Sequence, residues 1–141
     1  MKAKLLVMAL GVAMVLPATL FFSFPVRADA GMQLVVLPPI SKRTDFYGGA
    51  VIPLKFQLFD SNGMVISDAT GTAWVNGTPA TTVGHANVGN MFRFDPKSDL
   101  YIYNLNTKPL PAGPGSPPST IEIMVVAGGT TMMESFTVTL D

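Results

Sequence analysis

Cysteine is absent from this chain, and histidine and tryptophan each occur only once. Without cysteine, disulfides cannot stabilise the fold, and lipidation of the lipoprotein type is excluded. The single histidine, His85, lies among glycine, alanine and asparagine, and no second histidine or cysteine can complete a transition-metal site. Stability must therefore come from burial of apolar side chains, and we predict no metal or other cofactor.

A nucleophilic active site also lacks its usual sequence context. No serine lies in a Gly-x-Ser-x-Gly pattern, which presents the nucleophile of many hydrolases. Charged residues make up only 13% of the chain, and acidic and basic residues balance. Removal of the first thirty residues leaves six basic and eight acidic side chains, which gives no electrostatic basis for binding nucleic acid or an anionic membrane. We predict a protein that is not an enzyme and does not bind nucleic acid.

The N-terminal residues have the pattern of an export signal. Two lysines precede an apolar run over residues 5–24, and small residues follow at Ala28 and Ala30. An uncleaved membrane anchor is the alternative for an apolar run of this length, but Pro17 breaks a helix within it and favours cleavage. We predict a helical signal peptide over residues 1–30, cut after Ala30 or after Ala28. The protein would then be secreted, periplasmic or attached to the cell surface, with no membrane contact after cleavage.

The remaining residues, 31–141, have the size of one immunoglobulin-like sandwich. No stretch of a dozen residues keeps a helical period without glycine, proline, asparagine or aspartate, and short apolar runs alternate with turn residues. Strands are predicted over residues 32–37, 51–59, 64–67, 72–75, 78–83, 91–94, 100–105, 120–126 and 133–140. We predict one all-β domain, an immunoglobulin-like antiparallel β-sandwich of about seven to nine strands.

Alternation within these strands predicts which side chains form the core. In the 51–59 strand the inward set is Ile52, Leu54, Phe56 and Leu58. The C-terminal hairpin contributes Ile121, Ile123, Val125, Phe136, Val138 and Leu140. Trp74 is also predicted at the centre of the core, which is the usual place of a lone tryptophan in this fold class.

Two separated motifs resemble those of a known family. Pro53-Leu54-Lys55-Phe56, followed by the turn Asp60-Ser61-Asn62-Gly63, resembles the signature of the PxKF domain, a prokaryotic immunoglobulin-like module. Tyr101-Ile102-Tyr103-Asn104-Leu105 with Thr107 resembles the family's Tyr-x-Tyr-Asn-Leu-x-Thr segment, and the resemblance covers about residues 46–140. It implies an accessory module of secreted or surface proteins without catalytic residues, although here the module stands nearly alone behind a leader.

Four residues are candidates for contact with a partner. Lys55 either anchors a carboxylate or is a solvated lysine whose stem covers apolar surface. Tyr101 and Tyr103 share one face of their strand, where they either form a stacking platform or bond the backbone and lock the fold. Pro114 lies in the proline-rich segment 109–118, which is predicted to be a rigid exposed loop.

Three functions remain open from the sequence. The first is a structural or binding module that recognises another protein, or its own copies, through sheet edges and loops. The second is a small carbohydrate-binding module that uses Tyr101, Tyr103 and Trp74. The third is a calcium-stabilised adhesion unit with oxygen ligands from Asp60, Asn62, Asp95 and Asp99, residues that ordinary turn chemistry explains equally well.

Overall fold

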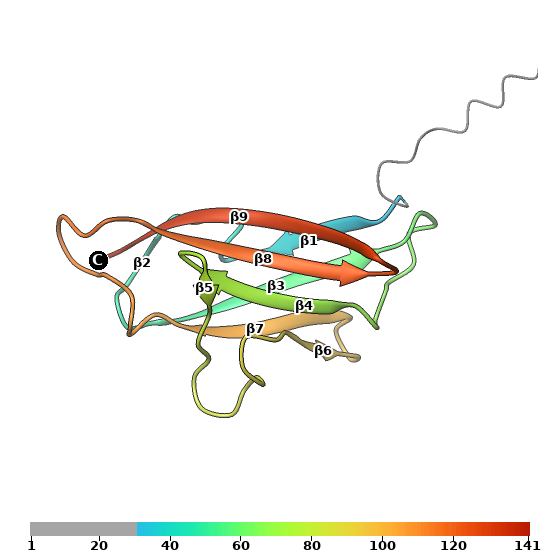
Figure 1. The fold of residues 1–141 in the computed structure, drawn as a ribbon, viewed down its shortest axis with the longest axis horizontal. Coiled ribbons are helices and arrows are strands. Elements are labelled where there is room, and N and C mark those ends of the chain that lie inside the picture. The colour runs from blue at the N-terminus through green and yellow to red at the C-terminus, as the bar shows by residue number, and fades with distance from the viewer. Residues whose placement is uncertain (1–30) are drawn as a thin grey trace, which may run out of the picture.

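A computed structural model describes residues 31–141, which form nine strands in two stacked sheets (Figure 1). The four-stranded sheet has the order β1-β3-β7-β6, and the five-stranded sheet has the order β2-β9-β8-β4-β5. Residues 31–141 contain no helix, and therefore none that is long and apolar enough to cross a membrane. The all-β sandwich predicted from the sequence is confirmed, whereas the predicted signal peptide lies outside the described residues.

The strand bounds follow the predicted pattern closely along most of the chain. The four-stranded sheet consists of β1 (Gln33–Leu37), β3 (Val51–Phe59), β6 (Arg93–Asp95) and β7 (Leu100–Asn106). The five-stranded sheet consists of β2 (Asp45–Phe46), β4 (Thr70–Val75), β5 (Thr78–Pro79), β8 (Ser119–Ala127) and β9 (Thr130–Leu140). All neighbouring strands are antiparallel except β2, which runs parallel to β9, so the larger sheet is mixed.

The core lies between the two sheets and is built by alternation. All four predicted inward side chains of β3 are buried, and so are the three of β8. On β9, Val138 and Leu140 are buried, whereas Phe136 is half-buried and packs against the core from the side. Full burial of one such aliphatic or aromatic side chain contributes about 1.5–3 kcal/mol, so this interior is the main source of stability.

An aromatic cluster fills one part of this interior. Phe56 stacks on Tyr101 with ring centroids 4.6 Å apart and an interplanar angle of 7°, and Phe92 meets Phe56 edge-on at 4.9 Å. Gly71 on β4 lies directly against this cluster, because a Cβ atom there would be 2.9 Å from Cζ of Phe56. The absence of a side chain at Gly71 therefore makes room for the Phe56 ring.

Pro53 occupies a position in β3 where no neighbouring strand needs a backbone N–H donor. The N–H of Thr107 donates to the carbonyl of Ala50, so even-numbered residues of β3 direct their backbone groups toward β7 and Pro53 directs its nitrogen to the other side. On that side β1 ends at Leu37, opposite Lys55. The proline therefore lies just beyond the last rung of the β1 ladder, where its missing N–H breaks no bond.

Two predicted strands are wrong in extent or kind. Residues 64–67 form only an isolated bridge between Val65 and Phe59, with the Ile66 N–H donating to the carbonyl of Leu58 over 2.8 Å. The run predicted over 78–83 is a strand only at Thr78–Pro79. After Ala80 the chain leaves the β4 edge and joins β7, as shown by the bond from the Asn106 N–H to the carbonyl of Thr81. A change of sheet is invisible to local alternation.

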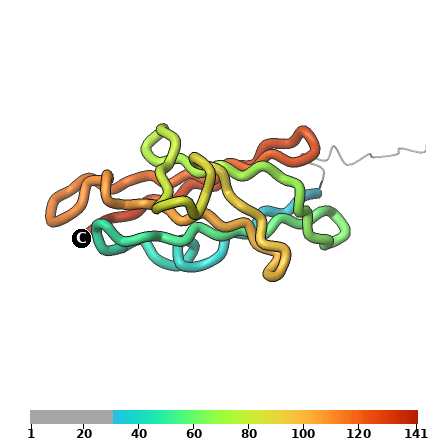
Figure 2. The backbone as a smooth tube through the Cα atoms, turned by 90° about the horizontal axis from the view of Figure 1, so that it is seen from below, coloured from blue at the N-terminus to red at the C-terminus, as the bar shows by residue number. Residues whose placement is uncertain are grey.

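Residues 80–95, called here the crossing segment, close one side of the sandwich. Its backbone bonds β4 at Ala80, then β7 at Thr81, then β4 again at Asn90 and Phe92, before it pairs with β7 as β6. In Figure 1 this segment loops out below the sheets at β5 and β6, and Figure 2, which views the molecule from below, shows it in front of them. The predicted strand over 91–94 is therefore shifted, because its first half belongs to the other sheet.

Candidate functional site

Both candidate tyrosines lie inside the protein. Tyr101 and Tyr103 are only 1% and 0% exposed. The Tyr101 hydroxyl donates to the carbonyl of Ile66 over 2.8 Å and accepts the Ala69 N–H over 3.0 Å, and the Tyr103 hydroxyl donates to the carbonyl of Gly89 over 3.1 Å. Each ring therefore ties a loop to the core, and neither can stack on a ligand.

Burial also changes the acidity of these phenols. Desolvation raises the pKa of Tyr101, opposed by the hydrogen bond from the Ala69 N–H. Desolvation alone raises the pKa of Tyr103 to about 12. Both hydroxyls are thus neutral donors at any physiological pH, which suits a structural role.

The other two candidates are accessible. Lys55 points outward from β3 and is half-buried between Leu37 and Ile102 of the flanking strands. Pro114 is exposed in the loop between β7 and β8, where the Ser116 N–H donates to the carbonyl of Gly113 and closes a turn. Gly115 has φ of +81°, so Pro114 and Gly115 occupy the central positions that a type II turn assigns to them. The exposed Pro114 is therefore held in a local turn.

Trp74 corrects the predicted core. Its neighbours Ala73 and Val75 point inward and are buried, whereas Trp74 is half-buried on the outside of the five-stranded sheet. Its Nε1–H donates to Oγ1 of Thr72 over 3.0 Å, which fixes the ring against its own strand. The prediction failed because Gly71 and Ala73 are so small that the alternation of β4 does not reveal which face is apolar.

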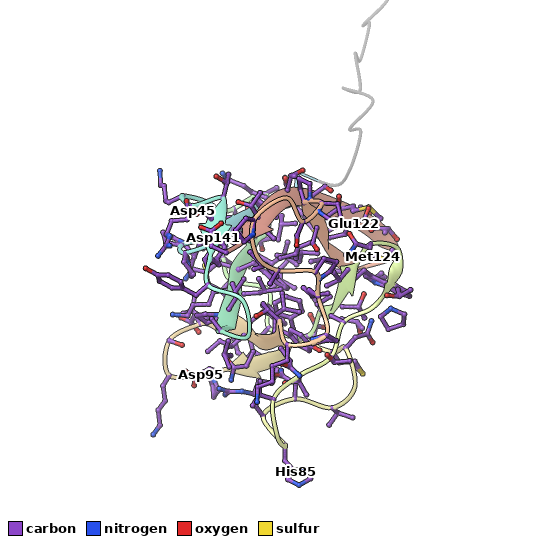
Figure 3. All side chains as sticks on the ribbon, turned by 90° about the vertical axis from the view of Figure 1, so that its left-hand side faces the viewer. Asp45, His85, Asp95, Glu122, Met124 and Asp141 are labelled. Atoms are coloured by element: carbon purple, nitrogen blue, oxygen red, sulfur yellow. The ribbon has the colours of Figure 1, made fainter. Side chains whose placement is uncertain are left out.

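An apolar surface surrounds this tryptophan. Strand register places Met91, Thr72, Met124 and Met133 in one row across the sheet, and Pro79, Trp74, Glu122 and Ser135 in the next. We call Trp74, Met91, Met124, Val126 and Met133 together the methionine face. Met91, Val126 and Met133 are 45%, 40% and 52% exposed, and Met124 lies beside Glu122 on the outside of the molecule in Figure 3. This surface was not predicted from the sequence, although Met124 and Met133 occupy outward positions in the alternating pattern of the C-terminal hairpin, which is a detectable signal.

Charge on this face is nearly absent. Glu122 is the only ionisable side chain at the outward positions of β4, β8 and β9. The opposite face of the sandwich differs, because Lys55 and Arg93 flank Ile102 there in a single row. The methionine face thus combines a tryptophan, flexible thioethers and one carboxylate, and tryptophan and methionine are residue types enriched in protein interfaces.

The remaining features offer little chemistry. A cavity of about 220 Å³ at the end of β4, β5 and β7 is lined by Val75, Thr78, Pro79, Ala80, Thr81, Leu105, Asn106, Pro109 and Leu110, none of them an acid or a base. His85 is exposed and points away from the body in Figure 3. Among residues 31–141 no group of three or more histidine, aspartate or glutamate side chains is placed to hold a metal ion.

The candidate calcium ligands take part in turns. Asp60 accepts the backbone N–H groups of Asn62 and Met64, and Asp95 accepts the Lys97 N–H and the Ser98 hydroxyl. The bonds from Ser98 and then Lys97 lower the pKa of Asp95. Both carboxylates are thus engaged in closing the loops that follow β3 and β6.

Fold and surface together define residues 31–141 as a β-sandwich that presents an apolar sheet face which no other part of these residues covers. No family model and no curated protein matches the chain.

Proposed function

We propose that this chain is a non-catalytic binding module, exported by a cleaved signal peptide, with an immunoglobulin-like sandwich related to the PxKF domain. Its ligand is another protein, which it contacts through the methionine face. The observation that carries this proposal is the row of methionines beside Trp74, on a sheet face that no other part of residues 31–141 covers.

The energetics of protein association support this assignment. Tryptophan is among the residues that contribute most to interfaces, and methionine adapts its shape to a partner. An exposed apolar surface on a soluble sandwich is a liability unless a partner covers it. Glu122, which lies next to Trp74 in the same row, favours a partner whose own apolar surface carries a lysine or arginine at the matching position.

The two alternative functions receive less support. A sugar platform would need the rings of Tyr101, Tyr103 and Trp74 at the surface. The two tyrosine rings are buried in the core, and Trp74 is half-buried. A calcium-stabilised adhesion unit would have to draw on Asp60 and Asp95, whose oxygens already accept hydrogen bonds from their own turns. Protein binding therefore remains the function that we propose.

The test compares matched charged substitutions on the two faces. Met133 and Val51 are similarly exposed, at 52% and 46%, and lie on opposite sheets. We expect the tagged wild-type chain and Val51→Glu to capture the same protein from the envelope of the native host, and Met133→Glu to lose it. Equal capture by both variants, or capture of a polysaccharide in place of a protein, would refute the proposal.

A further inference from the structure

The strand edges on the two sides of the sandwich differ in how far their backbone groups are hydrogen-bonded. On one side the crossing segment bonds the edges of β4 and β7, so few backbone groups there lack a partner. On the other side β1 is the outer strand of its sheet and β9 is next to the outer strand β2, and Figure 1 shows β1 and β9 along the same upper side of the molecule. Within residues 31–141, β9 has only the two-residue strand β2 beyond it.

Hydrogen bonds at the end of β9 identify which backbone groups face this edge. The N–H groups of Thr139 and Asp141 donate to the carbonyls of Thr44 and Phe46, over 2.7 and 2.9 Å. Backbone direction alternates along a strand, so the odd-numbered residues of β9 all face the same edge. Thr131, Met133, Ser135 and Thr137 therefore present N–H and C=O groups in continuation of the β2 ladder, with no partner strand in the described part of the chain.

The even-numbered side chains of β9 point toward the interior, and one of them is charged. Met132 and Phe136 are half-buried and pack against the core, as expected for this face. Glu134 lies between them in the strand, opposite the fully buried Ile123, yet it is exposed. A carboxylate thus interrupts the apolar margin of the sandwich in the middle of its open edge.

We propose that the β9 edge, residues 131–137, binds an extended segment of a partner protein as an additional strand. The segment would place a lysine or arginine opposite Glu134 and apolar residues two positions to either side, over Met132 and Phe136. Main-chain hydrogen bonds supply affinity in this mode, and the alternate side chains supply specificity. The inference rests on the proposed function, because it takes the partner to be a protein, and it adds how that partner is held.

Glu134 also decides against a second copy of this chain as the occupant. Antiparallel pairing of two β9 edges centred on residue 134 sets the two carboxylates directly opposite each other, which is destabilising. If the pairing of the two edges is centred on Met133, Glu134 lies opposite Met132 of the other copy, and if it is centred on Ser135, Glu134 lies opposite Phe136. In both cases each carboxylate meets an apolar side chain. An inward-pointing charge on an edge strand is a known protection against such self-pairing, and a basic partner removes the penalty.

The experiment uses the isotope-labelled full chain and a synthetic heptapeptide, threonine-valine-threonine-lysine-threonine-valine-threonine, followed by amide NMR. We expect the largest shifts at Thr131, Met133, Ser135 and Thr137. A peptide with glutamate in place of lysine should bind about fivefold more weakly, and Glu134→Lys should reverse that preference. Shifts confined to β1, absence of shifts, or an unchanged preference in Glu134→Lys would overturn the inference, as would a concentration-dependent dimer of the wild-type chain.

A backbone variant tests the hydrogen bonds themselves. Ser135→Pro removes one edge N–H without removing a bond to β8, and Ser135→Ala is the matched control. We expect binding of the lysine peptide to be lost in the proline variant and kept in the alanine variant, while both unfold at temperatures close to that of the wild type. If Met133→Glu abolishes partner capture but the peptide never binds, the proposed function stands and the strand-addition inference fails.

Discussion

At the residue scale, polar atoms placed inside the core determine how the loops are held. Tyr101 and Tyr103 carry their hydroxyls through the apolar interior to backbone groups of distant segments, at Ile66, Ala69 and Gly89. No buried side-chain nitrogen or oxygen in residues 31–141 lacks a hydrogen-bond partner. Removal of one member of such a pair therefore leaves the other unsatisfied, which is the expensive case.

The Tyr101 hydroxyl should be worth a measurable part of the stability. Tyr101→Phe keeps the ring stacked on Phe56 but leaves the Ala69 N–H and the Ile66 carbonyl without their partner. We expect a loss of about 1–3 kcal/mol in the free energy of unfolding, measured by urea denaturation. The control is Tyr47→Phe, at a 76% exposed position, which should change stability by less than about 0.5 kcal/mol. Equal effects of the two substitutions would contradict the assigned role.

Tyr103 should make stability depend on alkaline pH. Its pKa is about 12 in the folded protein, whereas an unfolded chain returns it to about 10. The stabilising contribution is therefore complete below about pH 10 and is lost as the pH rises toward 12. We expect the difference in unfolding free energy between wild type and Tyr103→Phe to shrink over this interval. A difference that stays constant across the interval would show that the phenol is not held neutral by burial.

At the element scale, the strands owe their positions to close fits that cross from one sheet to the other. β4 approaches the aromatic cluster at Gly71, and β3 can contain Pro53 because β1 has already ended. The buried side chain of Asn87 helps to hold the crossing segment to β7, together with the Thr82 hydroxyl, which donates to the carbonyl of Asn104 over 3.0 Å. The Asn87 amide donates to the carbonyls of Met91 and Ile102, and its oxygen accepts the Asn104 N–H.

Asn87 is therefore the clamp of the crossing segment. Asn87→Asp keeps the size of the side chain but removes both donors and adds a buried charge facing two carbonyls. We expect a loss of about 2–4 kcal/mol in unfolding free energy, measured by urea denaturation, because two donors are lost and a charge is buried. Asn62→Asp in the exposed turn after β3 is the matched control and should be nearly neutral. An equal effect of Asn87→Asp and Asn62→Asp on the unfolding free energy would refute the clamp.

The close fit of β4 gives a second prediction at this scale. Gly71→Ala sets a methyl group 2.9 Å from the Phe56 ring and 3.2 Å from Cβ of Phe92, so the cluster must shift. We expect destabilisation of about 1–3 kcal/mol, which is typical of overpacking. Adding Phe56→Leu should cost less in the Gly71→Ala background than in the wild type, because the smaller side chain relieves the clash. Strict additivity of the two substitutions would contradict this packing.

At the scale of the whole molecule, the sandwich joins strands that are distant in the chain. β1 pairs with β3, β3 with β7, β4 with β8, and β2 with β9, so only the β4–β5, β6–β7 and β8–β9 hairpins are local. On one side of the sandwich the crossing segment hydrogen-bonds to the edges of β4 and β7, and on the other side the β9 edge is open. This asymmetry places the methionine face and the open edge on the same sheet, where one partner could cover both.

Such a topology should fold slowly for its size. Most of its pairings must close long loops before they gain stabilising contacts, and sandwiches of this kind fold in milliseconds to seconds. We expect a main refolding phase in that range, followed through the fluorescence of the single tryptophan, Trp74, after dilution from urea. A microsecond phase that recovers the whole signal would be inconsistent with a transition state built from distant strands.

Local sequence was sufficient for a large part of this fold. The alternation of residues 51–59 and 120–126 determined both the strands and the inward faces, because a period of two needs no knowledge of partners. The Asp60 and Asp95 turns likewise followed from side chains that bond their own backbone. The absence of cysteine established in the same way that apolar burial, not cross-linking, stabilises the protein.

Only the tertiary structure decided the rest, because it depends on which strands meet. Whether Trp74 faces the core was settled by the pairing of β4 with β8, and whether Tyr101 and Tyr103 are platforms or anchors was settled by loops that lie 14 to 35 residues away. The switch of the crossing segment between sheets and the open edge at Glu134 belong to the same group. The alternation of neighbouring residues in the chain determines which side of its strand a residue faces. Its burial depends on whether another layer packs on that side.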